Sequence, residues 1–398
     1  MATKVTPEVE TFARIKVVGT GGSGQNVVNH MVNEKVRGVE FISVNTDAQD
    51  LHHSLAKKKI HIGKNLTKGL GAGMDPVIGK RAAEETKEEI QEALKGADMV
   101  FLTGGMGGGT GTGALPSIAQ VSRELGALTI GVVTKPFSFE GAQRMRIAQQ
   151  GLDELRKEVD ALVVIPNDRL FGVIQKDTSL KNAFSMCDEV LRQAVEGIAD
   201  LITMPGIINV DFADIRAILQ NAGSALMGIG QATGEKRAVE AAQMAINSPL
   251  LDVSVSGAKG VLFAVAGGED LTMMEIQDAA KIITENVDKD AKIIFGAIKD
   301  DRLKKNEIKV TVIASGFPEN NGVNPSLFQF GRKDVKEKEE EAPTKMFGSK
   351  KDVAPKIEHH EEPMVPIMKA PEPVELKPKA EDDEDEWGAI PAFLRRKK

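Results

Sequence analysis

Cysteine is nearly absent from this chain of 398 residues, since Cys187 is the only one. A single thiol excludes a disulfide framework and agrees with a reducing cytosol. No apolar stretch approaches the roughly 20 residues that a helix needs to cross a bilayer. Residues 1–10 are polar and acidic, so we expect no signal peptide. These absences predict a cytoplasmic protein without a transmembrane segment.

The chain also lacks an excess of positive charge, because 51 Lys and Arg residues are outnumbered by 58 Asp and Glu residues, which gives a net charge of −7 at pH 7. This balance argues against nucleic acid as the main partner. The histidine pairs His52-His53 and His359-His360 are adjacent and lack the i,i+4 spacing of a helical metal site. We therefore assign no protein ligand to a metal.

Strand-like and helix-like patterns alternate through most of the chain. Strands are predicted at residues 14–18, 40–44, 99–102, 128–134, 162–165, 261–265, 292–298 and 308–314. Helices are predicted at residues 24–36, 75–94, 114–124, 140–159, 179–204, 212–220, 235–247 and 272–286. Strands rich in Val, Ile and Leu between helices favour an α/β fold with a mainly parallel sheet covered on both faces. After the long helix that begins near residue 179, the pattern predicts a second, smaller α/β domain.

The most informative segment is a glycine-rich run, with seven glycines in residues 104–113. It lies between the apolar strand at 99–102 and a helix-like segment. Backbone without side chains lets another molecule approach the amides closely, and the following helix adds unpaired N–H groups at its N-terminus. Such a loop suits a phosphate chain, and Thr110 and Thr112 can add hydroxyl donors.

A second glycine cluster at residues 19–24 follows the first predicted strand and opens the first predicted helix. It matches the dinucleotide pattern G-x-G-x-x-G, and Asn45-Thr46-Asp47 lies near the place of a ribose-binding acid in an NAD protein. An NAD-dependent oxidoreductase is therefore a serious alternative. No G-x-x-x-x-G-K-[ST] motif exists, so a P-loop is excluded. With a third segment at residues 69–73, the glycine loops can surround a phosphate chain longer than a pyrophosphate.

Gly107-Gly108-Gly109-Thr110-Gly111-Thr112-Gly113 resembles the signature loop of the tubulin/FtsZ family. The resemblance covers about residues 12–317 and resumes at the C-terminal peptide. It implies a tubulin/FtsZ-like fold and a GTPase that binds GTP or GDP together with Mg²⁺. It also implies head-to-tail assembly into filaments of the bacterial division ring. A nucleotide-dependent scaffold that does not hydrolyse GTP is the third possibility.

The resemblance also implies a domain organisation that agrees with the pattern. We expect a GTP-binding domain at residues 12–178, a central helix at 179–205 and a C-terminal GTPase-activating domain at 206–317. A disordered linker at 318–386 follows, since residues 332–386 hold 17 acidic residues, 11 basic residues and seven prolines. Residues 387–398 form a C-terminal docking peptide.

The resemblance places the nucleotide on residues of three kinds. Positions in the glycine loops, or at the end of the second predicted strand, are Gly21, Gly22, Ser23, Asn26, Asn45, Asp47, Gly71, Ala72, Gly73, Gly104, Gly107, Gly108, Gly109, Thr110, Gly111, Thr112 and Gly113. Positions that meet the ribose and phosphates are Thr134, Pro136, Glu140 and Arg144, while Asn167 and Asp188 read guanine and Phe184 stacks on the base. A carboxylate accepts the N1–H and N2–H₂ donors of guanine, and adenine presents no such pair. The residues alone also allow Phe184 as a core residue, Asp188 as a solvated one, and Glu140 with Arg144 as a surface ion pair.

Catalytic groups are expected outside the glycine loops, which offer donors but no base. Asp211 and Asp214 are three residues apart at a helix start, so both carboxylates can project from one face. In the family, this segment with Asn209 enters the nucleotide pocket of the adjacent subunit, where two carboxylates can orient a water for in-line attack. Capping of the helix by Asp211 is the alternative.

The C-terminal peptide carries Ile390, Pro391, Phe393 and Leu394, followed by four basic residues. Nothing nearby in the sequence can bury this apolar group. The resemblance implies that membrane-anchoring and regulatory division proteins capture it.

Overall fold

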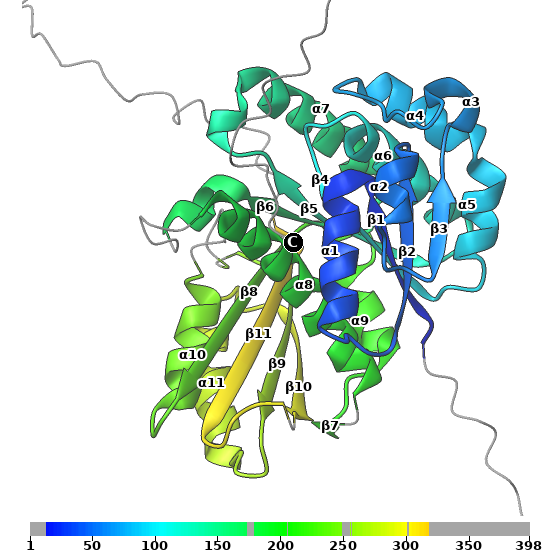
Figure 1. Cartoon of the computed structure of the whole chain (residues 1–398). Coiled ribbons are helices and arrows are strands. Elements are labelled where there is room, and N and C mark those ends of the chain that lie inside the picture. The colour runs from blue at the N-terminus through cyan, green and yellow to red at the C-terminus, as the bar shows by residue number, and fades with distance from the viewer. Residues whose placement is uncertain are drawn as a thin grey trace, which may run out of the picture. The chain divides into compact units, whose positions relative to one another are not determined.

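The computed structural model describes residues 13–172, 179–204, 206–248, 255, 257–300 and 302–317 (Figure 1). The predicted linker at 318–386 and the docking peptide with Ile390, Pro391, Phe393 and Leu394 lie outside the described residues. Within the described ranges, no helix is long and apolar enough to span a membrane.

The strands of the described residues join in one 11-stranded sheet with the order β3-β2-β1-β4-β5-β6-β8-β11-β9-β10-β7. Their bounds are β1 Ile15–Thr20, β2 Val39–Asn45, β3 Lys58–His61, β4 Met99–Gly105, β5 Leu128–Lys135, β6 Ala161–Pro166, β7 Gly206–Ile208, β8 Gly223–Thr233, β9 Gly260–Gly267, β10 Lys292–Lys299 and β11 Glu307–Ser315. The neighbours from β3 to β8 are all parallel, and so are β9 and β10. Only β11 against β8 and β9, and β7 against β10, run antiparallel. The predicted mainly parallel α/β sheet is confirmed.

Helices cover this sheet on both faces (Figure 1). Their bounds are α1 Gly21–Asn33, α2 Ala48–His52, α3 Lys64–Thr67, α4 Pro76–Glu85, α5 Lys87–Leu94, α6 Thr110–Glu124, α7 Ala142–Glu158, α8 Leu180–Thr203, α9 Phe212–Leu219, α10 Arg237–Ile246 and α11 Met273–Glu285. Alternate residues of β4 show the two faces. Met99 and Phe101 are buried in one core with α1, α8 and α9, while Val100 and Leu102 are buried in another with α4 to α7.

The long helix α8 joins the two halves of the sheet. Leu191 and Val195 of α8 belong to the same core as Phe101 of β4 and Leu262 of β9. Ser179 caps its N-terminus by accepting a hydrogen bond from the Asn182 amide at 3.3 Å. The second half places α10 and α11 on the opposite face, over Phe263 and Val265. The predicted central helix is therefore the element that runs from one half to the other.

The sequence prediction was wrong for residues 75–94, where it gave one helix. The structure has α4 and α5, which are separated at Thr86. The Thr86 hydroxyl donates to the Ala82 carbonyl at 3.2 Å and accepts from the Gly63 amide at 3.2 Å. These bonds tie the backbone to a neighbouring loop, and a hydroxyl that competes for helix carbonyls favours such a break.

The prediction also missed β8, whose 11 residues are rich in glycine and alanine. A Cβ at Gly228 would lie 1.8 Å from the Ala245 carbonyl oxygen, and one at Gly230 would lie 1.9 Å from the Ala241 carbonyl oxygen. Glycine is required because α10 packs directly on this strand. The same glycines remove the β-branched pattern by which a strand is recognised. Elements β3, β7, α2 and α3, which are short, were not predicted either.

Candidate functional site

A pocket of about 420 Å³ opens at the carboxyl ends of four parallel strands, β1, β4, β5 and β6. Ligand sites of open α/β sheets lie at this edge. The lining consists of Thr20, Gly21, Gly22, Ser23, Asn26, Gly73, Gly105, Met106, Gly108, Gly109, Thr110, Gly111, Thr134, Pro136, Glu140, Arg144, Asn167, Phe184, Cys187, Asp188 and Leu191. Sixteen of these are residues that the sequence analysis assigned to a nucleotide.

Two helix N-termini meet at this pocket. The helix α1 begins at Gly21 and α6 begins at Thr110, and at neither end does a side chain cap the free amides. The first N–H groups of a helix have no partner inside the helix and carry its positive dipole end. The Thr20 hydroxyl is buried beside them without a hydrogen-bond partner among the described residues. This end of the pocket therefore offers donors to an anion.

The glycine loops are locked together by backbone contacts. The Gly109 amide donates to the Gly73 carbonyl at 2.9 Å, which joins the loop after β4 to the loop before α4. A Cβ at Gly109 would lie 2.5 Å from that same carbonyl oxygen. The Thr110 hydroxyl is paired with the Thr46 hydroxyl at 2.5 Å, which ties α6 to the end of β2. Only glycine at 109 allows this close approach.

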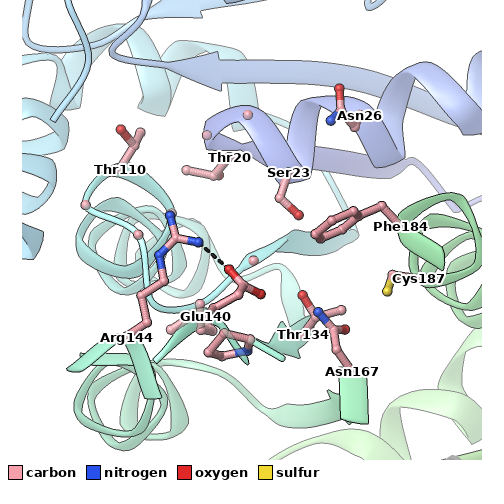
Figure 2. Close-up of a pocket in the computed structure, with 18 of the residues that line it drawn as sticks. Thr20, Ser23, Asn26, Thr110, Thr134, Glu140, Arg144, Asn167, Phe184 and Cys187 are labelled. Atoms are coloured by element: carbon pink, nitrogen blue, oxygen red, sulfur yellow. Dashed lines mark hydrogen bonds and ion pairs between the residues drawn. The ribbon is translucent and has the colours of Figure 1, made fainter. Parts of the chain in front are cut away.

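The other side of the pocket carries acceptors and an aromatic ring. Asn167 is 5% exposed, and its Oδ1 has no partner among the described residues. Phe184 is 41% exposed and meets Phe137 edge to face, with ring centroids 5.4 Å apart. Figure 2 shows Phe184 and Asn167 across the pocket from Thr110. A half-exposed ring and an unpartnered amide oxygen in one pocket are typical of a surface that binds a planar polar group.

Burial raises the pKa of the Asp188 carboxyl from 3.8 to about 6, and the nearby charge of His30 opposes that rise. Loss of water around a carboxylate disfavours its charged form. Cys187, the neighbouring residue, is also buried, and this raises the pKa of its thiol to about 12. Such a shift favours the uncharged thiol at neutral pH, whereas the thiolate is the nucleophilic and metal-binding form.

Glu140 and Arg144 form an ion pair on the wall opposite Phe184 (Figure 2). Glu140 also accepts a hydrogen bond from the Phe137 amide at 2.9 Å. Its side chain is 14% exposed and that of Arg144 is 40% exposed. The pair thus forms part of the pocket wall and lies beside Thr134 and Pro136, where the guanidinium can meet an anionic group.

Eight residues assigned to the nucleotide do not line the pocket: Asn45, Asp47, Gly71, Ala72, Gly104, Gly107, Thr112 and Gly113. Four of them make local contacts that shape the protein itself. The Asp47 carboxylate caps α2 by accepting from the amides of Gln49 and Asp50, and the Asn45 amide donates to the Asp50 carboxylate at 2.7 Å. The Thr112 hydroxyl accepts from the Gly107 amide at 2.8 Å and so shapes the loop from inside.

Five lining residues were missed: Thr20, Gly105, Met106, Cys187 and Leu191. Thr20, Gly105 and Met106 had a usable signal, because they lie inside or next to the glycine clusters. Cys187 and Leu191 neighbour Asp188 on α8, one residue before it and about one turn after it.

Asn209, Asp211 and Asp214 lie outside the pocket, at the opposite end of α8, and all three are exposed. The Asp211 side chain caps α9 by accepting a hydrogen bond from the Ala213 amide at 3.1 Å. Helix capping was the alternative role that the sequence analysis gave for Asp211. Asn209 accepts from the Gly206 amide at 2.7 Å, which closes the turn that precedes these acids. Within one copy of the chain, these residues and the pocket are therefore separate.

Comparison with known proteins gives two family matches, to separate segments of the chain. Residues 14–175 match the GTPase domain of the tubulin/FtsZ family, and residues 223–318 match the C-terminal domain of the FtsZ family.

Solved structures agree with these matches. An FtsZ dimer from M. jannaschii has 49% sequence identity and a TM-score of 0.74, over 77% of this chain and 89% of that one. A mutant of M. jannaschii FtsZ has 48% identity and a TM-score of 0.74, over 77% and 92%. CetZ2 from Haloferax volcanii, in a protofilament with GTPγS, has 20% identity and a TM-score of 0.67, over 77% and 94%, which shows a shared fold. By its family matches and its identity to FtsZ structures, this chain belongs to the tubulin/FtsZ family.

Proposed function

We propose that this protein binds and hydrolyses GTP and that it polymerises head-to-tail, with each active site completed between adjacent subunits. The observation that carries the proposal is the division of the pocket into two chemically different ends. Uncapped helix N-termini lie at one end, and Asn167, Asp188 and Phe184 lie at the other. A nucleoside triphosphate has the matching division into phosphates and base.

The base end favours guanine. The Asp188 carboxylate can accept both the N1–H and the N2–H₂ of guanine, and the unpartnered Oδ1 of Asn167 is a further acceptor. Phe184 offers its exposed ring for stacking. Adenine has no N1–H and no N2 amine, so it cannot donate two adjacent hydrogen bonds to the carboxylate, and buried polar groups without partners are costly.

The phosphate end supplies charge stabilisation. Amides of Gly21 and Gly22 at α1, and of Thr110 and Gly111 at α6, open toward a bound phosphate chain. A magnesium ion is expected to accompany the triphosphate and to neutralise its charge. Among the described residues, no group of three or more His, Cys, Asp or Glu side chains has an arrangement that could hold a metal ion. Phosphate oxygens and water would therefore supply most of its ligands.

Hydrolysis then requires a base near the phosphates, and the pocket's own carboxylates are engaged elsewhere, since Glu140 pairs with Arg144 and Asp188 lies at the base end. Asp211 and Asp214 are exposed at the other end of α8, and a head-to-tail contact brings that end of one subunit to the pocket of the next. Two carboxylates there orient and polarise the attacking water. The M. jannaschii relative was solved as a dimer, and CetZ2 as a protofilament, which supports self-association.

We further propose the cellular role of the family's division proteins: filaments of a cytoplasmic division ring beneath the membrane, recruited through the apolar and basic C-terminal peptide. The alternative of an NAD-dependent oxidoreductase loses its main support, because Asp47 caps α2 and does not line the pocket. A measurement of GTP hydrolysis is needed to distinguish the GTPase from the other alternative, a nucleotide-dependent scaffold that does not hydrolyse GTP.

The test is the dependence of turnover on protein concentration. We expect GTP hydrolysis per subunit to rise with concentration, because each active site needs two subunits. Measuring phosphate release across a wide dilution series, with chromatographic identification of the nucleotide retained after purification, checks both parts. Constant specific activity down to high dilution would reject the shared active site, and a retained nicotinamide cofactor would reject guanine.

A pH dependence of nucleotide affinity follows from Asp188. In the free protein, burial holds the pKa of its carboxyl at about 6, while guanine donors favour the ionised form and lower that pKa on binding. Binding therefore releases a proton at acidic pH. We expect GDP affinity to be constant above about pH 7 and to fall by up to about tenfold per pH unit below about pH 6.

Competition binding of GDP between about pH 5 and pH 8 measures this profile. The Asp188→Asn variant is the control, because it keeps the contribution of every other titrating group, His30 included. A wild-type profile as flat as that of the variant would show that Asp188 does not bind the base in its ionised form.

A further inference from the structure

The end of α8 nearest the proposed catalytic loop carries buried carboxylates on one side. Glu196, Asp200 and Met204 follow one another at intervals of four residues, so they share a face. Glu196 is 4% exposed and Asp200 is 9% exposed. Carboxylates this well buried require cationic partners.

Arg302, in the connection between β10 and β11, reaches both of them. Its Nη1 donates to Glu196 at 2.6 Å and its Nη2 to Asp200 at 2.8 Å, and the same Nη2 lies 3.8 Å from the Met204 sulfur. It also holds Asp300, which follows β10, through Nε at 2.8 Å and Nη2 at 2.9 Å. One guanidinium thus joins the last two turns of α8 to the end of β10.

The charges around this guanidinium make it hard to replace. Burial raises the pKa of Asp200, the negative charge of Glu196 adds to that rise, and Arg302 opposes it. The carboxyl of Asp300 is also penalised by burial, yet hydrogen bonds from Arg302 hold its pKa below the usual value. Arg192 also pairs with Glu196, but both residues belong to α8. Without Arg302, buried carboxylates of two elements would face each other.

Both anchored elements adjoin the loop of residues 206–214, because α8 precedes it in the chain and β10 pairs with its first strand, β7. The strand β7 begins this loop just after α8, and its pairing with β10 is limited to Ile208 with Ala297 and Gly206 with Ile298, with a register shift between them. So short a strand cannot fix the loop by its own ladder. We propose that Arg302 is a positioning residue for this loop: by fastening the end of α8 to the end of β10, it sets where Asp211 and Asp214 are presented to the neighbouring subunit.

This inference rests on the proposed role of that loop, and it predicts a specific separation of effects. Arg302 lies at the far end of α8 from the nucleotide pocket, since Asp188 and Asp200 are about 18 Å apart along the helix axis. We expect Arg302→Ala to lower GTP turnover per polymer mass by about tenfold or more, because small displacements of catalytic groups are costly. GTP affinity should remain that of the wild type.

Mixed filaments distinguish a displaced loop from a damaged fold. Arg302→Ala has an intact pocket and a displaced loop, whereas Asp188→Asn has a damaged pocket and an intact loop. In GTP, a one-to-one mixture contains junctions that pair the good pocket with the good loop. If the two variants enter the filament at random, about a quarter of all head-to-tail junctions combine an intact pocket with an intact loop. We expect turnover well above the sum of the two variants measured alone.

Two further variants complete the design. Lys305→Ala removes a charge from an exposed position of the same connection and should behave as wild type. Arg302→Lys keeps one charge with shorter reach, so its turnover should lie between those of Arg302→Ala and the wild type.

The mixture of Asp214→Asn with Asp188→Asn separates the two proposals. If it fails to regain turnover, the shared active site is wrong. If it succeeds and the Arg302→Ala mixture fails, only the positioning role is wrong. Wild-type turnover in Arg302→Ala, or equal loss of GTP binding and turnover in both Arg302 variants, also overturns that role.

Discussion

Replacing Asp214 by Asn should reduce GTP hydrolysis by roughly a hundredfold or more, the scale of a general acid–base contribution, while GTP binding and filament formation persist. Asn keeps the size of the side chain and removes the charge that polarises water. Asp214 is exposed in the first turn of α9 and far from the pocket of its own subunit. The substitution therefore leaves the residues that contact the nucleotide in that subunit unchanged.

Phosphate release at equal polymer mass is the measurement, with sedimentation to quantify polymer and calorimetry to quantify binding. Asp278→Asn is a matched control, because it removes an exposed carboxylate from the solvent face of α11. If Asp214→Asn releases phosphate at the wild-type rate for the same polymer mass, Asp214 does not take part in the reaction. A large loss of GTP affinity would instead place Asp214 in the binding machinery.

The fold was accessible from the sequence wherever hydrophobic periodicity was strong. The strands around Phe101 and Leu262 are buried on both faces, so they read as continuous apolar runs. The sequence analysis missed β8 because the composition of this strand is set by a tertiary contact. Its glycines serve the close approach of α10, and no local propensity reports that contact. The break at Thr86 likewise depends on the Gly63 amide, from a loop 23 residues earlier.

Only part of the pocket lining was predicted, because the sequence carries local signals but not tertiary contacts. Glycine-rich loops that follow strands can be recognised from the sequence alone. Three residues from such loops, Gly21, Gly108 and Thr110, line the pocket. Which glycines face the cavity and which support the loop depends on hydrogen bonds such as that from the Gly107 amide to Thr112. Adjacent residues in one loop can thus have opposite roles. The periodicity of α8 marked its apolar face but not which polar positions at its start line the cavity.

Replacing Asp188 by Asn should exchange guanine for xanthine as the preferred base. The carboxylate accepts two donors from guanine, whereas the Asn amide presents one acceptor and one donor. Xanthine keeps N1–H and carries an oxygen in place of the N2 amine, so it matches the amide. We expect GTP affinity to fall by about a hundredfold or more, since charge-assisted pairs are strong and a mismatch leaves buried groups unpaired. Affinity for xanthosine triphosphate should rise over that of the wild type.

The exchange is measured by titrating GTP and xanthosine triphosphate into the wild type and the variant. The test is strong because it predicts a loss of affinity for one nucleotide and a gain of affinity for the other. A variant that had merely lost stability would bind both nucleotides poorly, so gain of xanthosine triphosphate binding cannot come from damage to the fold. Stability itself should not suffer, because burial penalises the charged carboxylate and the neutral amide avoids that penalty. Filaments of the variant should form and turn over with xanthosine triphosphate, since Asp211 and Asp214 of the adjacent subunit are unchanged. Unaltered preference for GTP in the variant would show that another group reads the base, and the unpartnered Oδ1 of Asn167 would then be the acceptor to replace.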